Sequence, residues 1–63
     1  MNNMLKTLRT ARGLTQQQLA EALGVSRQTV ISIESGKYDP SLPLAFKIAR
    51  YLDTSIEKVF LPD

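Results

Sequence analysis

The chain has 63 residues, a formal net charge of +2, no Cys and no His. This length predicts one small domain over residues 1–63, and the missing residue types exclude disulfides, thiolate metal sites, the usual zinc sites and the commonest catalytic base of enzymes. No apolar run approaches the roughly 20 residues that span a bilayer, and residues 1–6 lack the apolar stretch of a signal peptide, so we expect a non-enzymatic intracellular domain without cofactor, metal or membrane partner.

The positive charge is concentrated in the first part of the chain. Residues 1–38 contain five basic and two acidic side chains, which gives +3, whereas residues 39–63 contain three and four, which gives −1. A basic segment favours an anionic partner. Ordinary scatter of surface charges is the alternative interpretation.

Five short helices are predicted from apolar spacing and from residues that favour helix ends. In the first helix, Leu5 and Leu8 recur at helical spacing, and Gly13 can end it in the left-handed conformation. Asn2 or Asn3 is expected to cap its N-terminus. No segment alternates polar and apolar residues long enough to predict a strand.

The second and third helices are marked by caps at both ends. Thr15 and Gln18 have the spacing of a capping box, with Thr15 at the N-cap, and Gly24 ends the second helix. Ser26 is expected to cap the third helix, which ends at Gly36.

The last two helices follow the loop 37–40. Ser41 is expected to cap the fourth, and Pro43 fits its first turn because the missing N–H costs little there. Ser55 is expected to cap a short fifth helix, after which Pro62 ends the pattern. The side chains expected to form the core are Leu5, Leu8, Leu14, Leu19, Leu23, Val25, Val30, Ile33, Leu42, Leu44, Ile48, Leu52, Ile56, Val59 and Phe60.

Residues 16–35 have the spacing of a helix-turn-helix motif. The connection 24–26 is so short that the two helices must cross at a steep angle. Ala20 allows the close crossing, Gly24 tolerates a positive φ, and Val25 fills the corner. Together these residues predict an all-α domain built around this motif.

The outer face of the third helix is polar. A rotation of 100° per residue places Gln28, Ser32 and Ser35 away from the core, with Arg27 in the exposed first turn. Glutamine can bond bidentately to adenine, and arginine to guanine. Ile31 lies between the core and this face, where it can contact a thymine methyl. An ordinary solvated helix face is the alternative.

Several stretches of the chain resemble the phage-repressor (Cro/CI-like, XRE-type) helix-turn-helix family. They are LTQQQLA (14–20), LGVSRQTV (23–30), IESGK (33–37), DPSL (39–42) and LDTSIEKVF (52–60). The resemblance covers about residues 4–60. It implies a compact five-helix, lambda-repressor-like DNA-binding domain with the helix-turn-helix at its second and third helices.

The resemblance also implies roles for individual residues. Base contacts are expected from Ser26, Arg27, Gln28, Ile31 and Ser32. Phosphate contacts are expected from Thr15, Gln16, Gln17, Ser35, Lys37 and Tyr38. Tyr38 fits a loop anchor equally well, and Ile31 is more apolar than is usual at its place. Arg9 and Glu34 are expected to form a partly buried ion pair that joins the first and third helices, the alternative being two independent surface charges.

The expected function is that of a sequence-specific DNA-binding transcriptional regulator, a repressor that reads an operator half-site in the major groove with its third helix. An antitoxin or protein-interaction adaptor built on the same fold is the alternative, because a fold does not fix a function. The chain has only two Phe and two Tyr, and the polar outer helix face favours DNA over a protein partner.

The expected partners are double-stranded DNA and a second copy of the chain. One helix reads only a few base pairs, and two copies double the contact. The residues expected at the homodimer contact lie near the C-terminus and are Tyr51, Lys58, Phe60, Leu61 and Pro62. Alternatively, the apolar residues of this group complete the core of a single chain. We expect a cytoplasmic protein of bacterial, archaeal or phage origin, associated with the nucleoid when bound.

Overall fold

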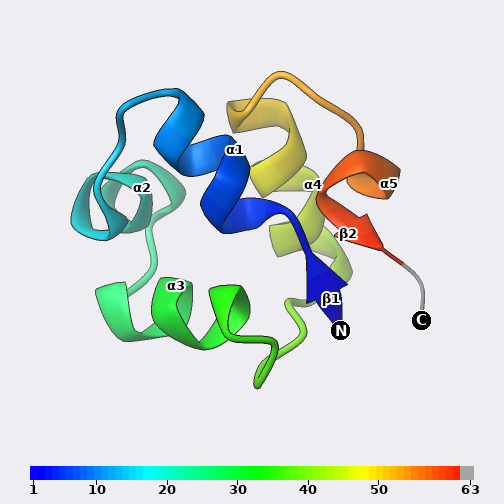
Figure 1. Ribbon diagram of the computed structural model, residues 1–63. Coiled ribbons are helices and arrows are strands. Elements are labelled where there is room, and N and C mark those ends of the chain that lie inside the picture. Colours follow the sequence, from blue (N-terminus) through cyan, green and yellow to red (C-terminus); the bar gives the residue numbers. More distant parts are fainter. Residues whose placement is uncertain (62–63) are drawn as a thin grey trace.

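Helices α1 to α5 surround a common core, and a pair of very short strands joins the two ends of the described chain (Figure 1). The computed structural model describes residues 1–61. The elements in chain order are β1 (Asn2–Asn3), α1 (Leu5–Ala11), α2 (Gln16–Leu23), α3 (Arg27–Glu34), α4 (Leu42–Tyr51), α5 (Ile56–Val59) and β2 (Phe60–Leu61). The all-α, five-helix expectation is confirmed. Within this part of the chain, none of the helices has the length and apolar character needed to cross a membrane.

The core draws apolar side chains from each of the helices. The buried ones are Leu5, Leu19, Ala20, Leu23, Val30, Ile33, Ala45, Ile48, Ala49, Leu52, Val59 and Phe60. Leu8, Leu14, Val25, Leu44 and Ile56 are partly buried against them. The expectation that Leu42 belongs to the core is wrong, because its side chain is 64% exposed. It is the first residue of α4, where the Cβ points back toward the helix N-terminus and away from the core.

The expected caps of α2, α3 and α4 are present. Oγ1 of Thr15 accepts the Gln18 amide at 3.0 Å, and Oε1 of Gln18 accepts the Thr15 amide at 2.9 Å, which completes the capping box. Oγ of Ser26 accepts the Thr29 amide at 3.1 Å, and Oγ of Ser41 accepts the Leu44 amide at 3.4 Å. These bonds fix where the helices begin, and therefore how the short connection between α2 and α3 aims α3.

Two other expected caps differ from the structure. Ser55 is at the N-cap of α5, but its side chain makes no capping hydrogen bond. Because α5 has only four residues, the Ser55 carbonyl suffices to accept the amides of Lys58 and Val59, at 3.1 and 3.3 Å. The N-cap of α1 is Met4 rather than an asparagine. Asn3 instead lies one residue earlier, in β1.

The two strands form a contact that the sequence pattern did not predict. Asn2 pairs with Leu61 and Asn3 with Phe60 in antiparallel register. The Asn3 side chain adds two bonds: Nδ2 donates to the Ile33 carbonyl at 2.8 Å, and Oδ1 accepts the Leu5 amide at 3.1 Å. We call β1, β2 and the Asn3 side chain the terminal clasp. It joins α1, the end of α3 and β2.

Gly24 ends α2 in the left-handed conformation, with φ at +72°. A Cβ there would lie 3.6 Å from Nζ of Lys47, an ordinary contact, so a side chain would meet backbone strain but no clash. We expect Gly24→Ala to lower the free energy of unfolding by about 1–2 kcal/mol, and Gly24→Asn by less, because Asn adopts this conformation more readily. Urea unfolding followed by circular dichroism measures both.

Gly13 is the matched control, because its φ is +70° and nothing lies within 4 Å of the Cβ position. Gly13→Ala should cost about as much as Gly24→Ala. Equal stability of the alanine variants and the wild type would contradict the strain argument.

Candidate nucleic-acid interface

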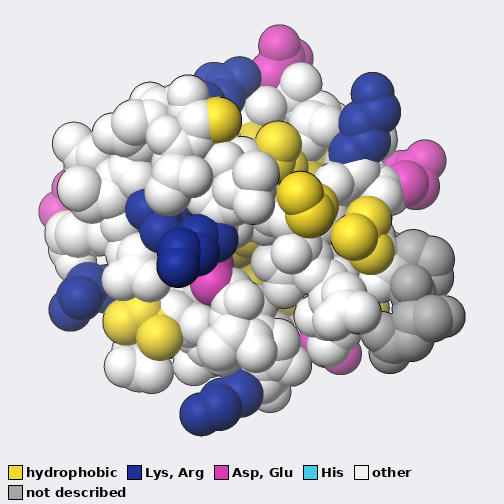
Figure 2. Space-filling view, viewed as in Figure 1, with side chains coloured by type: hydrophobic (Ala, Val, Ile, Leu, Met, Phe, Trp, Pro, Cys, Tyr) yellow, Lys and Arg dark blue, Asp and Glu magenta, His cyan; other side chains and the backbone are white. Residues whose placement is uncertain are grey.

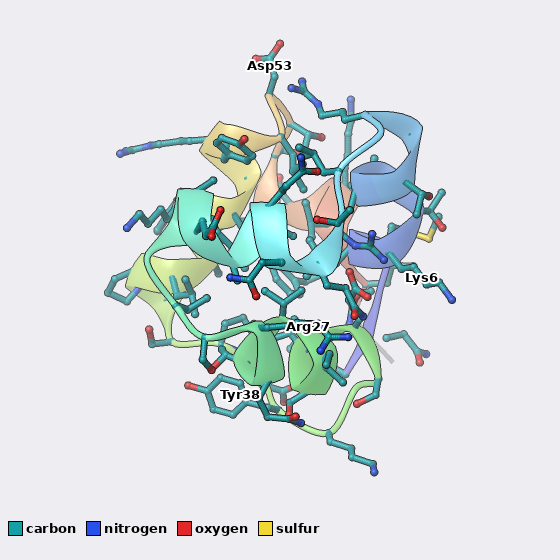
Figure 3. The ribbon with its side chains drawn as sticks, turned by 90° about the vertical axis from the view of Figure 1, so that its left-hand side faces the viewer. Lys6, Arg27, Tyr38 and Asp53 are labelled. Atoms are coloured by element: carbon teal, nitrogen blue, oxygen red, sulfur yellow. The ribbon has the colours of Figure 1, made fainter. Side chains whose placement is uncertain are left out.

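Helix α3 lies at one edge of the molecule, with its outer face in solvent (Figure 3). Val30 and Ile33 hold its inner face in the core. Ser26, Arg27 and Gln28 are exposed at its N-terminal end. Two further residues expected to contact bases, Ile31 and Ser32, are half-buried along its side, and Ser35 is exposed at its end.

The polar side chains of this face bond to one another and to the backbone of α3. The hydroxyls of Ser26 and Thr29 lie 2.9 Å apart, and Oγ of Ser35 donates to the Ser32 carbonyl at 3.0 Å. Nε2 of Gln28 lies 3.5 Å from Oγ of Ser32, which is longer than a strong hydrogen bond. Among residues 1–61, no hydrogen bond or ion pair engages the guanidinium of Arg27. The donors of Gln28 and Arg27 are therefore available to an outside partner.

The N-terminus of α2 offers backbone rather than side-chain donors. Nε2 of Gln16 donates to Oε1 of Glu34 at 3.1 Å, and Nε2 of Gln17 donates to Oε2 of Glu21 at 3.2 Å. The Thr15 hydroxyl is used in the capping box. The amides of Gln16 and Gln17, at the first two positions of α2, have no intrahelical acceptor. Such amides are suited to an anion at a helix N-terminus.

A buried ion pair lies beneath this surface and joins α1 to α3. Nε of Arg9 lies 2.6 Å from Oε2 of Glu34, and Nη2 lies 3.3 Å from Oε1. The side chains are only 9% and 6% exposed. Nη1 of Arg9 also donates to the Leu14 carbonyl at 2.7 Å. With the bond from Gln16, Glu34 therefore connects α1, α2 and α3, and the two charges are not independent surface groups.

The loop after α3 folds back against the helix. The amides of Lys37 and Tyr38 bond to the Ser32 carbonyl at 3.1 and 3.2 Å, which leaves both side chains exposed. Figure 3 shows Tyr38 lying alongside α3, with Arg27 on the helix nearby. A shallow hollow is lined by Ser26, Gln28, Thr29, Ser32 and Tyr38. Thr29, which is not among the residues expected to contact DNA, lines this hollow through its bonds to the Ser26 cap.

Basic and hydrophobic side chains of the visible face are unevenly distributed but overlap in part. Figure 2 shows Lys and Arg side chains spread over α1, α2 and α3 and also beside α5, and hydrophobic side chains gathered toward α5 and β2 and also over α3. At the opposite end of the molecule from α3, Figure 3 places Asp53. Basic side chains therefore lie close to the exposed donors of α3, although they are not confined to that part of the face.

The expected dimer residues do not form one group. Tyr51 on α4 and Leu61 on β2 are exposed, whereas Phe60 is buried, and Pro62 lies outside the described residues. A groove of about 270 Å³ beside Phe60 is lined by Met1, Pro40, Leu42, Ala45, Ile56 and Phe60. A second hollow meets it at Ile56 and is lined by Phe46, Ala49, Arg50, Thr54, Ser55, Ile56 and Glu57.

Comparison with known proteins gives consistent matches over nearly the whole chain. A model of the helix-turn-helix family HTH_3 matches residues 5–59. An uncharacterized HTH-type transcriptional regulator of Methanocaldococcus jannaschii is 59% identical over 61 residues, covering 97% of this chain and 92% of the relative. One from Bacillus subtilis is 48% identical over 60 residues, covering 95% and 91%. The crystal structure of the restriction-modification controller protein C.AhdI from Aeromonas hydrophila matches with a TM-score of 0.80 and 39% identity, covering 89% of this chain and 85% of that one.

The buried ion pair gives a stability prediction. We expect Glu34→Leu alone to lower the free energy of unfolding by about 3 kcal/mol or more, because it leaves the Arg9 guanidinium buried without its partner. Adding Arg9→Met should recover much of this loss, since replacing both members of a buried pair by apolar groups is often neutral. Urea unfolding of the two single variants and the double variant measures the coupling. The exposed Arg50→Met is the control, with a change within about 0.5 kcal/mol. Losses that simply add would show that Arg9 and Glu34 act independently.

Proposed function

The chain belongs to the XRE-type helix-turn-helix family and is a DNA-binding transcriptional regulator, and on that premise we propose that it acts as a repressor that binds a two-fold operator as a homodimer. The observation that carries this proposal is the contrast between the two faces of α3. The inner face is locked by the core and by the Arg9–Glu34 pair, while the outer face keeps the donors of Arg27 and Gln28 unused. A rigid helix with unused donors at an exposed edge suits the major groove.

In this proposal the N-terminal half of α3 reads base edges. Gln28 bonds bidentately to an adenine and Arg27 to a guanine, the pairings for which their geometries are suited. Ser26 and Ser32 contribute hydroxyls, and the half-buried Ile31 contacts an apolar group at the groove wall. The face carries only one cation, so its specificity rests on hydrogen bonds rather than on charge.

Phosphate contacts flank this reading face. The free amides of Gln16 and Gln17 at the start of α2 bind one phosphate, near the Thr15 cap. Lys37 and the exposed Ser35 contact the backbone beyond the end of α3. Because the Gln16 side chain is held by Glu34, it orients the N-terminus of α2 rather than reaching for the phosphate itself.

Repression is the mode that requires least of the protein. A bound dimer need only exclude the transcription machinery from its site, whereas activation also needs a productive contact with that machinery. In-vitro transcription, from a template that carries an operator selected with this protein, tests whether binding lowers or raises transcription. Reduced transcript supports repression, and increased transcript overturns it.

The alternative of an antitoxin or adaptor draws support from the apolar groove between α4 and α5, which suits a protein partner. We assign that groove to a second copy of the chain. Leu42, which lines the groove, is 64% exposed, and Phe46, one helical turn further along α4 in the adjoining hollow, is 47% exposed. Arg50 and Glu57, which have opposite charges, line the adjoining hollow. A two-fold axis there pairs each of them with its opposite on the partner.

This surface adjoins Phe60, which is part of the C-terminal contact expected from the sequence. Tyr51 is nine residues from Leu42, and a rotation of 100° per residue places it on the opposite flank of α4. A two-fold contact centred on the groove therefore leaves Tyr51 out. The proposed dimer requires the two α3 helices to meet half-sites about 34 Å apart.

The base-reading proposal predicts an effect on specificity. Gln28→Ala and Arg27→Ala should each weaken binding to the selected operator by about 1–3 kcal/mol and relax the preference at one base pair per half-site. Lys37→Ala should weaken binding to all sequences alike and lower the salt slope by about one for each chain. Fluorescence titration on operator and random duplexes at several salt concentrations measures both. Asp53→Asn is the control, because this remote charge should leave both quantities unchanged. Equal losses on operator and random DNA for Gln28→Ala would contradict base reading.

The dimer proposal predicts that Leu42→Glu and Phe46→Glu weaken self-association at least tenfold while leaving the fold intact. Each change removes an exposed apolar side chain, worth about 1.5–3 kcal/mol when buried at a contact. Tyr51→Glu on the other flank should leave association unchanged. Sedimentation with and without an operator duplex measures the stoichiometry. One chain per duplex at saturation, on a site without two-fold symmetry, would rule the dimer out.

A further inference from the structure

Tyr38 borders the hollow on the outer side of α3. Its side chain is 46% exposed, and its amide bond to the Ser32 carbonyl brings the loop close to the helix. The hollow has a volume of about 270 Å³, slightly below that of small-ligand pockets, so it accommodates part of a base rather than a whole ligand. Gln28 lines the same hollow. An aromatic ring and an adenine-reading amide therefore share one small site.

The other groups of the hollow are largely satisfied within the protein. The hydroxyls of Ser26 and Thr29 bond to each other at 2.9 Å, and Ser26 also accepts the Thr29 amide. Gln28 is held only by its 3.5 Å contact to Ser32, which is easily given up. Among the hydrogen bonds of residues 1–61, none uses the Tyr38 hydroxyl. The Tyr38 ring is thus the large apolar group that lines the hollow, and the Gln28 amide beside it is released at little cost.

We propose that this hollow accepts the C5-methyl group of a thymine, with the Tyr38 ring as its apolar wall, while Gln28 reads the adenine paired with that thymine. In the major groove, an A·T pair presents the N7 and N6 groups of adenine together with the O4 and methyl groups of thymine. A glutamine amide beside an aromatic wall matches both halves of that pattern. Tyr38 is then a specificity-determining residue, and the pair it reads with Gln28 is A·T in one orientation.

This inference rests on the proposed function and names the base pair read at one of its sites. A contact of the Tyr38 hydroxyl with a phosphate is the competing role. The two roles differ in what they require: the methyl contact needs the ring and a thymine methyl, whereas the phosphate contact needs the hydroxyl and is blind to sequence.

The test removes the methyl from the DNA and the ring from the protein. An operator duplex is first selected from a random pool with the wild-type protein, and each thymine is then replaced singly by deoxyuridine. At one position per half-site, we expect the replacement to weaken wild-type binding about fourfold, the value of one buried methyl group. Tyr38→Phe should keep this sensitivity. Tyr38→Ser should bind more weakly and should no longer distinguish thymine from deoxyuridine at that position.

Tyr51→Ser is the matched control, since it removes an exposed tyrosine remote from α3 and should retain the full sensitivity. Circular dichroism and urea unfolding verify that each variant is folded. The proposal is overturned if no thymine replacement changes wild-type affinity, or if Tyr38→Ser retains the sensitivity. It is also overturned if Tyr38→Phe alone loses affinity on all sequences, which would assign the hydroxyl to a phosphate. Failure of the proposed function would be seen earlier, because the wild-type protein would then select no duplex at all.

Discussion

The orientation of α3 depends on the buried pair between Arg9 and Glu34. A buried charge is tolerated only when its partner and its remaining hydrogen bonds are in place. Glu34 can therefore occupy only one position, set by Arg9 on α1 and by Gln16 on α2. Because Gln16 opens α2, the same carboxylate fixes the distance between the free amides of that helix and the exposed face of α3. The surface proposed to meet a phosphate and the surface proposed to meet base edges move as one body.

Local signals in the sequence were sufficient for the helices and for the motif. The capping box of Thr15 and Gln18 and the left-handed Gly24 are set by interactions within a few residues, so spacing alone predicts them. The contacts that were missed join distant parts of the chain or depend on helix ends. The terminal clasp has two residues per strand, too few for any alternation to be visible. The exposure of Leu42 is not predicted, because apolar periodicity does not distinguish a first-turn side chain, which points off the end of its helix.

The candidate site also has features that sequence spacing predicts and features that it does not. Rotation along α3 predicts that Gln28 and Ser35 are exposed, and the position of Arg27 in the first turn predicts its exposure, because one helix has one periodicity. The engagement of the Gln16 side chain by Glu34, and the hollow beside Tyr38, arise from packing between elements. The shift of the proposed dimer contact toward Leu42 and Phe46 has that origin as well. Sequence spacing thus predicts which side chains are exposed to an outside partner. Only the folded structure shows which of these side chains already bond within the protein.

The terminal clasp has a consequence for the order of folding. Pairing Asn2 with Leu61 closes a loop of nearly the whole chain, whereas α2 and α3 meet across three residues. The entropy lost in closing a loop rises with its length, so the crossing of α2 and α3 forms early and the clasp forms late. Opening of the native protein reverses this sequence. Separation of the clasp releases the Ile33 carbonyl from Asn3, while the Gly36 amide and the Arg9–Glu34 pair still hold the last turn of α3. The two ends of the chain can therefore part without a change in the direction of α3.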